Sequence, residues 1–239
     1  MSKSRVRVVV AVVVSAMITG FVATAGTADV VRARSAGVVA PRLTVSDARV
    51  LHSVKVNERV VFITIDDGGY IAPSLVAYLN RRRIPVTSFV MPEPLLWMWG
   101  RFKQIKRMDY GNHTNTHAHL RRLSQAQQKR EICTGRRLVA RISGQTPVLF
   151  RPPGGDYNDA TKRAMVSCGM RYLVLWNVVA DDQIIRMRRS HRLMPGDIIL
   201  MHYRSDIIAS LEHLMDQLRH DGLRPALLAD YLRYGRPGE

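Results

Sequence analysis

The stretch Val60-Val61-Phe62-Ile63-Thr64-Ile65, followed at once by Asp66-Asp67-Gly68-Gly69, decides the fold of this chain. A run of β-branched and aromatic residues that ends in turn residues predicts a buried strand running into a turn. Two carboxylates therefore stand where the strand ends. In α/β folds the functional groups gather at such strand ends, so this stretch also marks a candidate site.

Strands and helices alternate along the rest of the chain. Further strands are predicted at 86–91, 148–150, 172–176 and 197–201. Helical spacing predicts helices at 72–83, 123–142, 159–168 and 207–220, the second of them capped by Ser124. This order indicates an α/β fold with a mostly parallel sheet. Arg151 and His202, like the two aspartates, then fall just past strand ends.

The first 25 residues read as a secretory signal peptide. A basic start at Lys3, Arg5 and Arg7 precedes the uncharged apolar stretch 8–22, and Ala23-Thr24-Ala25 offers a cleavage pattern. The stretch is short for a membrane span, which takes about 20 apolar residues, and an uncleaved anchor is the minority alternative. Residues 26–57 then form a linker or an edge extension, and a single domain is expected at 58–235. The protein is expected to be secreted or associated with the cell envelope.

The net charge and the two cysteines indicate which binding partners and which compartment to expect. The formal charge is +17, and removal of the three positive charges of residues 1–25 leaves +14. For an exported chain this favours contact with an anionic cell envelope. Nucleic acid is not expected because no binding motif is present, and no stable protein partner is implied. An oxidising compartment permits a disulfide between Cys133 and Cys168, but the pairing depends on geometry. Both cysteines are interpreted as structural.

Two short patterns carry chemistry. His113 and His117 stand at i and i+4, which predicts one face of a helical turn and suits two imidazoles on one cation. Asp66 and Asp67 are adjacent, so in an extended segment they point opposite ways and should differ in role. Each pattern alone is more often a surface coincidence or a plain turn. Together they offer one carboxylate and two imidazoles, which is the ligand set of a catalytic metal site with an open position.

Such a set suggests hydrolysis. A bound metal polarises a carbonyl and lowers the pKa of bound water, and the second carboxylate accepts the water proton. His202 is the candidate acid, because imidazole titrates near neutrality. Zinc is the expected metal from the ligand types, with cobalt or nickel as alternatives.

Four motifs in order then resemble the polysaccharide deacetylases of carbohydrate esterase family 4, the NodB-homology domain. They are Thr64-Ile65-Asp66-Asp67-Gly68, His113-Thr114-Asn115-Thr116-His117, Arg151-Pro152-Pro153-Gly154-Gly155 and Leu200-Met201-His202. The resemblance covers about residues 58–234. It implies a distorted (β/α) barrel and removal of N-acetyl groups from an acetylated polysaccharide, such as peptidoglycan or a chitin-like polymer.

The resemblance also implies a role for each matched position. Asp66 would be the general base, paired with Arg151, and His202 the general acid. The metal would be held by Asp67, His113 and His117. The Gly154 N–H would stabilise the oxyanion, and Leu200 would line the acetyl pocket, with Trp176 as a further pocket residue.

One family motif, usually D-x-x-D-W, is altered here. The equivalent stretch is Val179-Ala180-Asp181-Asp182-Gln183. Asp182 matches the second aspartate and is expected to orient His202, with Asp181 as the competing choice. Gln183 stands at the position of the pocket tryptophan, so the resemblance implies that one wall of the usual acetyl pocket is missing. The rival functions are an O-acetyl esterase and a glycan-binding protein without catalysis.

The segment 95–99 is apolar and rich in tryptophan, and it is expected to form a loop. Exposed aromatic rings there would be able to stack on sugar rings. Packing in the core or under a lid is the more common reason for such a segment.

Overall fold

The structure is a computed structural model that describes residues 44–188 and 191–232. All of them belong to one compact unit, Pro41–Glu239. The strands are β1 Arg49–Leu51, β2 Val60–Asp67, β3 Val86–Val90, β4 Met108–Asn112, β5 Leu149–Phe150, β6 Tyr172–Val174, β7 Val178–Asp181, β8 Ile184–Met187, β9 Ile198–His202 and β10 Arg224–Pro225. The helices are α1 Pro73–Arg82, α2 Pro92–Phe102, α3 Gln125–Ser143, α4 Asp159–Ser167, α5 Ile207–His220 and α6 Leu228–Tyr231, with short 3-10 turns at Val45–Asp47, Leu120–Arg122 and Pro153–Gly155.

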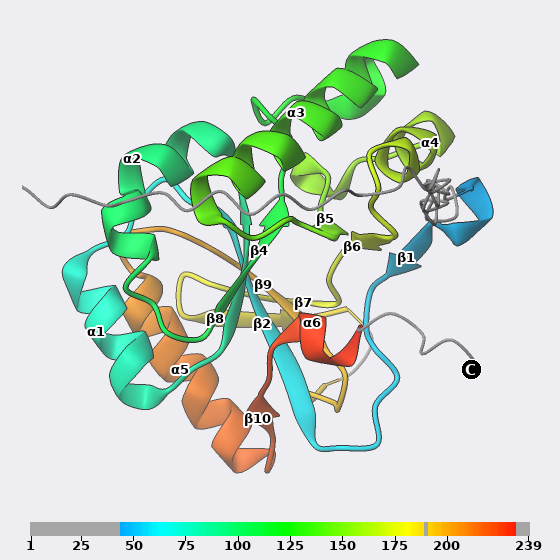
Figure 1. Cartoon of the computed structure of the whole chain (residues 1–239). Coiled ribbons are helices and arrows are strands. Elements are labelled where there is room, and N and C mark those ends of the chain that lie inside the picture. The colour runs from blue at the N-terminus through cyan, green and yellow to red at the C-terminus, as the bar shows by residue number, and fades with distance from the viewer. Residues whose placement is uncertain (1–43, 189–190, 233–239) are drawn as a thin grey trace, which may run out of the picture. The chain divides into compact units, whose positions relative to one another are not determined.

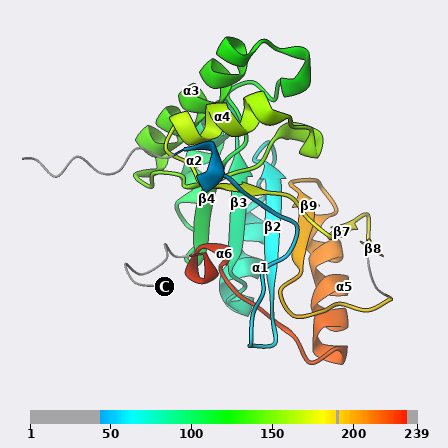
Figure 2. The same cartoon turned by 90° about the vertical axis from the view of Figure 1, so that its right-hand side faces the viewer.

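The strands form one curled sheet with β2 near its middle (Figure 1). Their order is β1-β6-β5-β4-β3-β2-β9-β7-β8, and β10 pairs with β2. Every pairing between these strands is parallel except the β7–β8 hairpin. Figure 2 shows β4, β3, β2 and β9 side by side. The result is the predicted α/β fold, a single-domain half-barrel dominated by parallel strands.

Strand β2 is buried on both faces, and its two faces serve different cores. Val61, Ile63 and Ile65 pack in the largest hydrophobic cluster, which includes apolar residues of α1 and α5. Phe62, on the other face, packs with Phe89 inside the curl of the sheet. Because side chains alternate along a strand, Thr64 and Asp66 share the inner face with Phe62. The fold thus directs a hydroxyl and a carboxylate into the half-barrel.

The predicted helices are confirmed to within one or two residues at each end. Ser124 caps α3 in a capping box. Its side chain accepts a hydrogen bond from the Gln127 N–H, and the Gln127 side chain accepts one from the Ser124 N–H. The loop expected at 95–99 is wrong, since these residues lie in α2. Its prolines stand in the first turn, where Pro92 loses no helical hydrogen bond.

Residues 49–51, within the segment 26–57, form β1 at the edge of the sheet beside β6. The signal-peptide region 1–25 lies outside the described residues. Among the described residues, no helix is long and apolar enough to span a membrane.

Candidate active site

The base candidate Asp66 lies at the end of β2, where it is 3% exposed and paired with Arg151. Arg151 follows β5 and is fully buried. Its Nη1 donates to Asp66 Oδ1 at 2.7 Å and to Thr64 Oγ1 at 2.8 Å. Its Nε and Nη2 donate to the carbonyls of Val174 and Leu175 at 3.0 and 3.2 Å. A buried charge is tolerated only when it is paired and hydrogen-bonded, and this guanidinium is both.

Asp67, the last residue of β2, has a left-handed backbone with φ of 80°. The alternation of an extended strand therefore does not hold at this residue. Both carboxylates approach the same imidazole, since His113 Nε2 lies 3.8 Å from Asp66 Oδ2 and 3.6 Å from Asp67 Oδ1. Their surroundings still differ, because Arg151 pairs with Asp66 and Asp67 faces the two histidines. The expected difference in role between Asp66 and Asp67 therefore rests on their different partners, and not on side chains that point in opposite directions.

The two histidines lie in a loop after β4, so the predicted helical turn is wrong. The loop is left-handed at Thr114 (φ 69°) and His117 (φ 60°). His113 Nδ1 lies 2.8 Å from the Arg151 carbonyl oxygen, which only an N–H can satisfy. Nε2 is then the unprotonated nitrogen and faces the carboxylates. Burial lowers the pKa of His113, which favours this neutral form.

Asp67, His113 and His117 are suited to hold a cation. Their ligand atoms all lie within 4.8 Å of one another, and His117 Nε2 is 3.4 Å from Asp67 Oδ1. Asp67 Oδ1 is buried and has no hydrogen-bond partner within the described part of the chain. Leaving such an oxygen unpaired costs on the order of 1–3 kcal/mol or more, and a cation would remove that cost. One carboxylate oxygen and two imidazole nitrogens are the donor types that zinc accepts.

The acid candidate His202 ends β9, directly beside Asp66 in the register of the sheet. Its Nδ1 donates to Asp181 Oδ2 at 2.7 Å, and its backbone N–H donates to Asp181 Oδ1 at 3.0 Å. This hydrogen bond to Asp181 raises the pKa of His202. An imidazole that keeps its proton to higher pH, with a side chain 26% exposed, is suited to donate that proton to a ligand.

The prediction that Asp182 is the partner of His202 is wrong. The partner is Asp181, the competing choice. Asp181 is the last residue of β7, and β7 runs beside β9. Asp182 is the first residue of the hairpin turn, has φ of 54°, and pairs with Arg204 at the surface. Gln183 occupies the next turn position, is exposed, and donates its backbone N–H to Ser210.

Of the two expected pocket residues, Leu200 lies on β9 and Trp176 follows β6. Leu200 is buried on β9 two residues before His202 and is in register with Thr64, so it faces the inside of the half-barrel. Trp176 lines a cavity of about 340 Å³ together with Gly154, Gly155, Leu175 and Arg188. Gly154 has φ of 64° and open space where a side chain would be, so a ligand can approach its backbone.

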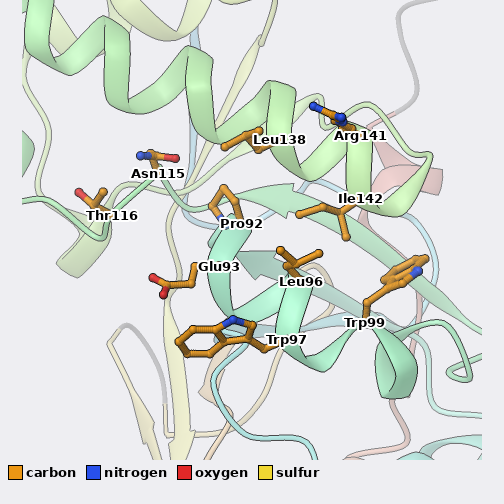
Figure 3. Close-up of a pocket in the computed structure, with 10 residues that line it drawn as sticks. All are labelled: Pro92, Glu93, Leu96, Trp97, Trp99, Asn115, Thr116, Leu138, Arg141 and Ile142. Carbon is orange, nitrogen blue, oxygen red and sulfur yellow. The ribbon is translucent and has the colours of Figure 1, made fainter.

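A second, larger pocket adjoins the histidine loop. It has a volume of about 790 Å³ and lies between α2 and α3 (Figure 3). Asn115 and Thr116, from the loop between the two histidines, lie at one end, and Arg141 and Trp99 lie at the other. Trp97 is 71% exposed, so this part of the tryptophan-rich segment is surface and not core.

Sequence reasoning missed several residues of the site. Thr64 accepts a hydrogen bond from Arg151, and Arg188 lines the cavity beside Trp176. The side chain of Glu131, on α3, accepts hydrogen bonds from backbone N–H groups of the histidine loop. Thr64 stands next to the aspartates and was open to prediction. Arg188 and Glu131 carry no local signal, because each is brought to the site by the fold, Arg188 by the β7–β8 hairpin and Glu131 by helix α3.

The half-barrel therefore brings together a candidate base paired with arginine, a candidate three-ligand cation site and a candidate histidine acid, which is a composition suited to a hydrolytic centre. Residues 53–173 match the family described as polysaccharide deacetylase. The chain is 35% identical over 191 residues to an uncharacterized protein of Streptomyces coelicolor, covering 77% of each. It is 28% identical over 204 residues to the peptidoglycan-N-acetylglucosamine deacetylase of Bacillus cereus, covering 74% of this chain and 90% of the relative. The protein belongs to the polysaccharide deacetylase family.

Solved structures share the fold. An inhibitor complex of the Bc1960 peptidoglycan N-acetylglucosamine deacetylase matches with a TM-score of 0.66 at 20% identity, over 78% of this chain and 94% of that one. A family 4 pseudoenzyme from Bacillus anthracis matches with a TM-score of 0.63 at 19% identity, over 77% of this chain and 69% of that one. Since enzymes and a pseudoenzyme share this fold, activity has to be argued from the site.

Proposed function

We propose that the protein is a divalent-metal hydrolase that removes N-acetyl groups from an N-acetylglucosamine polymer and releases acetate. Among such polymers we favour peptidoglycan, because the Bacillus cereus relative is named a peptidoglycan-N-acetylglucosamine deacetylase. The observation that carries the proposal is the division of labour between adjacent carboxylates, in which Arg151 pairs with Asp66 and Asp67 faces His113 and His117.

The residues act in sequence on water and an acetamide. Asp67, His113 and His117 would hold the cation, with zinc preferred and cobalt or nickel as alternatives. When bound, the cation would polarise the acetyl carbonyl and acidify water. Asp66 accepts a proton as the water oxygen attacks the carbonyl carbon. The Gly154 N–H stabilises the negative oxygen of the tetrahedral intermediate.

His202 completes the reaction. In its protonated form it donates a proton to the leaving nitrogen, the carbon–nitrogen bond breaks, and acetate and a free amine remain. Asp181 orients the ring and stabilises its positive charge. Leu200 and Trp176 offer apolar surface for the acetyl group and the sugar.

The decisive test is acetate release by the zinc-loaded mature protein from N-acetylglucosamine oligomers and from peptidoglycan. Asp66→Asn and a metal-stripped sample serve as controls, and release lost in both supports the mechanism. Release only from acetylated xylan would favour the O-acetyl esterase. Binding of glycan and zinc without release of acetate from any substrate would favour a glycan-binding protein, the outcome that the altered segment 179–183 leaves open.

Export is part of the proposal. The basic and apolar start of the chain supports a cleaved signal, and the Cys133–Cys168 disulfide suits an oxidising compartment. The expected location is outside the cell membrane, where a basic mature chain meets an anionic envelope. Detection of the protein in the culture fluid or wall fraction with an N-terminus near residue 26 would support this. Retention in the cytosol would contradict it.

A further inference from the structure

The loop that carries the two metal-ligand histidines is held to α3 by a single carboxylate. Glu131 Oε2 accepts the backbone N–H of Thr116 at 2.9 Å and that of Asn115 at 3.2 Å. These two residues lie directly between His113 and His117. No side chain of the loop takes part in either bond, so the contact fixes the course of the backbone itself.

The backbone N–H groups of the two histidines are also bound. The His113 N–H donates to the Val90 carbonyl at 3.1 Å, and the His117 N–H donates to Thr114 Oγ1 at 3.1 Å. The bonds to Val90 and Thr114 are local or come from the neighbouring strand. Glu131 is the acceptor that reaches the middle of the loop from a separate helix.

This support is needed because the loop is strained. Thr114 and His117 both have left-handed backbones, and a β-branched threonine rarely adopts one. Such conformations persist only where their surroundings fix them. Hydrogen bonds to an ionised acceptor are stronger than neutral ones, so a carboxylate is suited to this purpose.

Helix α3 is built to come close to the loop. A Cβ at Gly135, one turn after Glu131, would lie 2.5 Å from Asn112 Oδ1 and 2.7 Å from the Thr114 carbonyl group. The Asn112 amide donates to the Ile132 carbonyl of the same helix at 2.9 Å. Cys133, in the same turn, is joined by a disulfide to Cys168 at the end of α4. The helix is therefore a fixed platform against which the loop is positioned.

We propose that Glu131 is a positioning residue that pre-forms the metal site by holding the Asn115–Thr116 backbone, which sets the separation of the His113 and His117 nitrogens. It touches neither the cation nor the substrate. The inference rests on the metal site of the proposed function and not on the hydrolysis of acetyl groups. Its effect is accordingly measured on Zn²⁺ binding and on the metal-free protein.

The test compares Glu131→Ala, Glu131→Gln and the control Glu212→Ala, which makes the same change at an exposed position of α5. Zn²⁺ affinity is measured by competition with a chelator. Loss of a partner that orients metal ligands typically weakens affinity about 10–100-fold, and we expect this of Glu131→Ala. Glu131→Gln keeps an oxygen acceptor of equal reach without the charge, so it should rescue part of the loss. Glu212→Ala should bind as the wild type does.

Amide hydrogen exchange in the metal-free proteins measures how well the loop is held when no metal is bound. The Asn115 and Thr116 amides should exchange faster in Glu131→Ala, while those of β3 and β9 keep their rates. Zn²⁺ affinity within twofold of wild type, or unchanged exchange at both amides, would overturn the proposal. If Glu131→Ala does not fold, Glu131→Gln decides by the same two measurements. A wild-type protein that binds no Zn²⁺ would overturn the metal site and this inference with it, whereas Zn²⁺ binding without deacetylation would overturn only the proposed function.

Discussion

The two histidine-bearing halves of the site are built in different ways. His202 ends a strand, and its partner Asp181 ends a neighbouring parallel strand, so sheet register brings the pair together. His113 and His117 lie on a loop with left-handed residues, held from outside by α3. The half proposed to supply the acid (the acid half) is thus fixed by regular secondary structure, and the half proposed to hold the metal (the metal half) is fixed by specific contacts to an irregular loop. The acid half should tolerate changes in its surroundings better than the metal half does.

The largest expected effect comes from the metal half. Asp67→Ala removes the carboxylate of the proposed cation site and should abolish Zn²⁺ binding. Acetate release should then fall to the level of the metal-stripped protein. Calorimetric titration with Zn²⁺ and an acetate assay would check this. An Asp67→Ala protein that retains Zn²⁺ and activity would show that the cation site lies elsewhere.

A change in the acid half should separate catalysis from metal binding. His202→Asn removes the proton donor, and kcat should fall about 10²–10⁴-fold, the usual contribution of general acid–base catalysis. Zn²⁺ affinity should stay as in the wild type, since His202 is not a ligand. Loss of Zn²⁺ together with activity would mean that the two halves are not independent.

The pH profile tests the link between Asp181 and His202. The acid must be protonated, so activity should fall as pH rises through the pKa of His202, which the hydrogen bond to Asp181 raises. Asp181→Asn removes that charge and should move the alkaline limb to lower pH. Asp182→Asn, a change at the exposed neighbour, should leave the limb in place. The opposite pattern would restore Asp182 as the partner.

The smallest effect concerns the contact between α3 and the loop. Gly135→Ala gains up to about 1 kcal/mol of helix propensity but places a methyl group against Asn112 and Thr114, and overpacking costs about 1–3 kcal/mol. We expect a net loss of about 1–2 kcal/mol in the free energy of unfolding. Gly100→Ala in α2, where the added Cβ meets nothing within 4 Å, should gain about 0.5–1 kcal/mol. Denaturant unfolding of both variants measures the contrast, and equal effects would contradict the close approach.

Sequence reasoning predicted the strand-borne parts of the fold and failed at its irregular parts. The β-branched run 60–65 predicted β2 because burial on both faces leaves a continuous apolar signal. The spacing of His113 and His117 predicted a helical turn, because the spacing of residues carries no information about left-handed backbone conformations such as those of Thr114 and His117. Helix α2 was missed because two prolines stand at its start, where they resemble the residues of a loop. Asp181 and Asp182 are alike in sequence, and only the hairpin register separates them.

The disulfide closes a covalent ring of chain from Cys133 to Cys168. Within that ring lie Arg151, which pairs with the proposed base Asp66, and Gly154, the proposed oxyanion donor. The exposed turn at Gly144 also lies inside it, between α3 and β5. A protease that cuts there would not release either piece, because the disulfide holds the two pieces together as one molecule. The cut protein should migrate as a single species on a gel until a reducing agent is added.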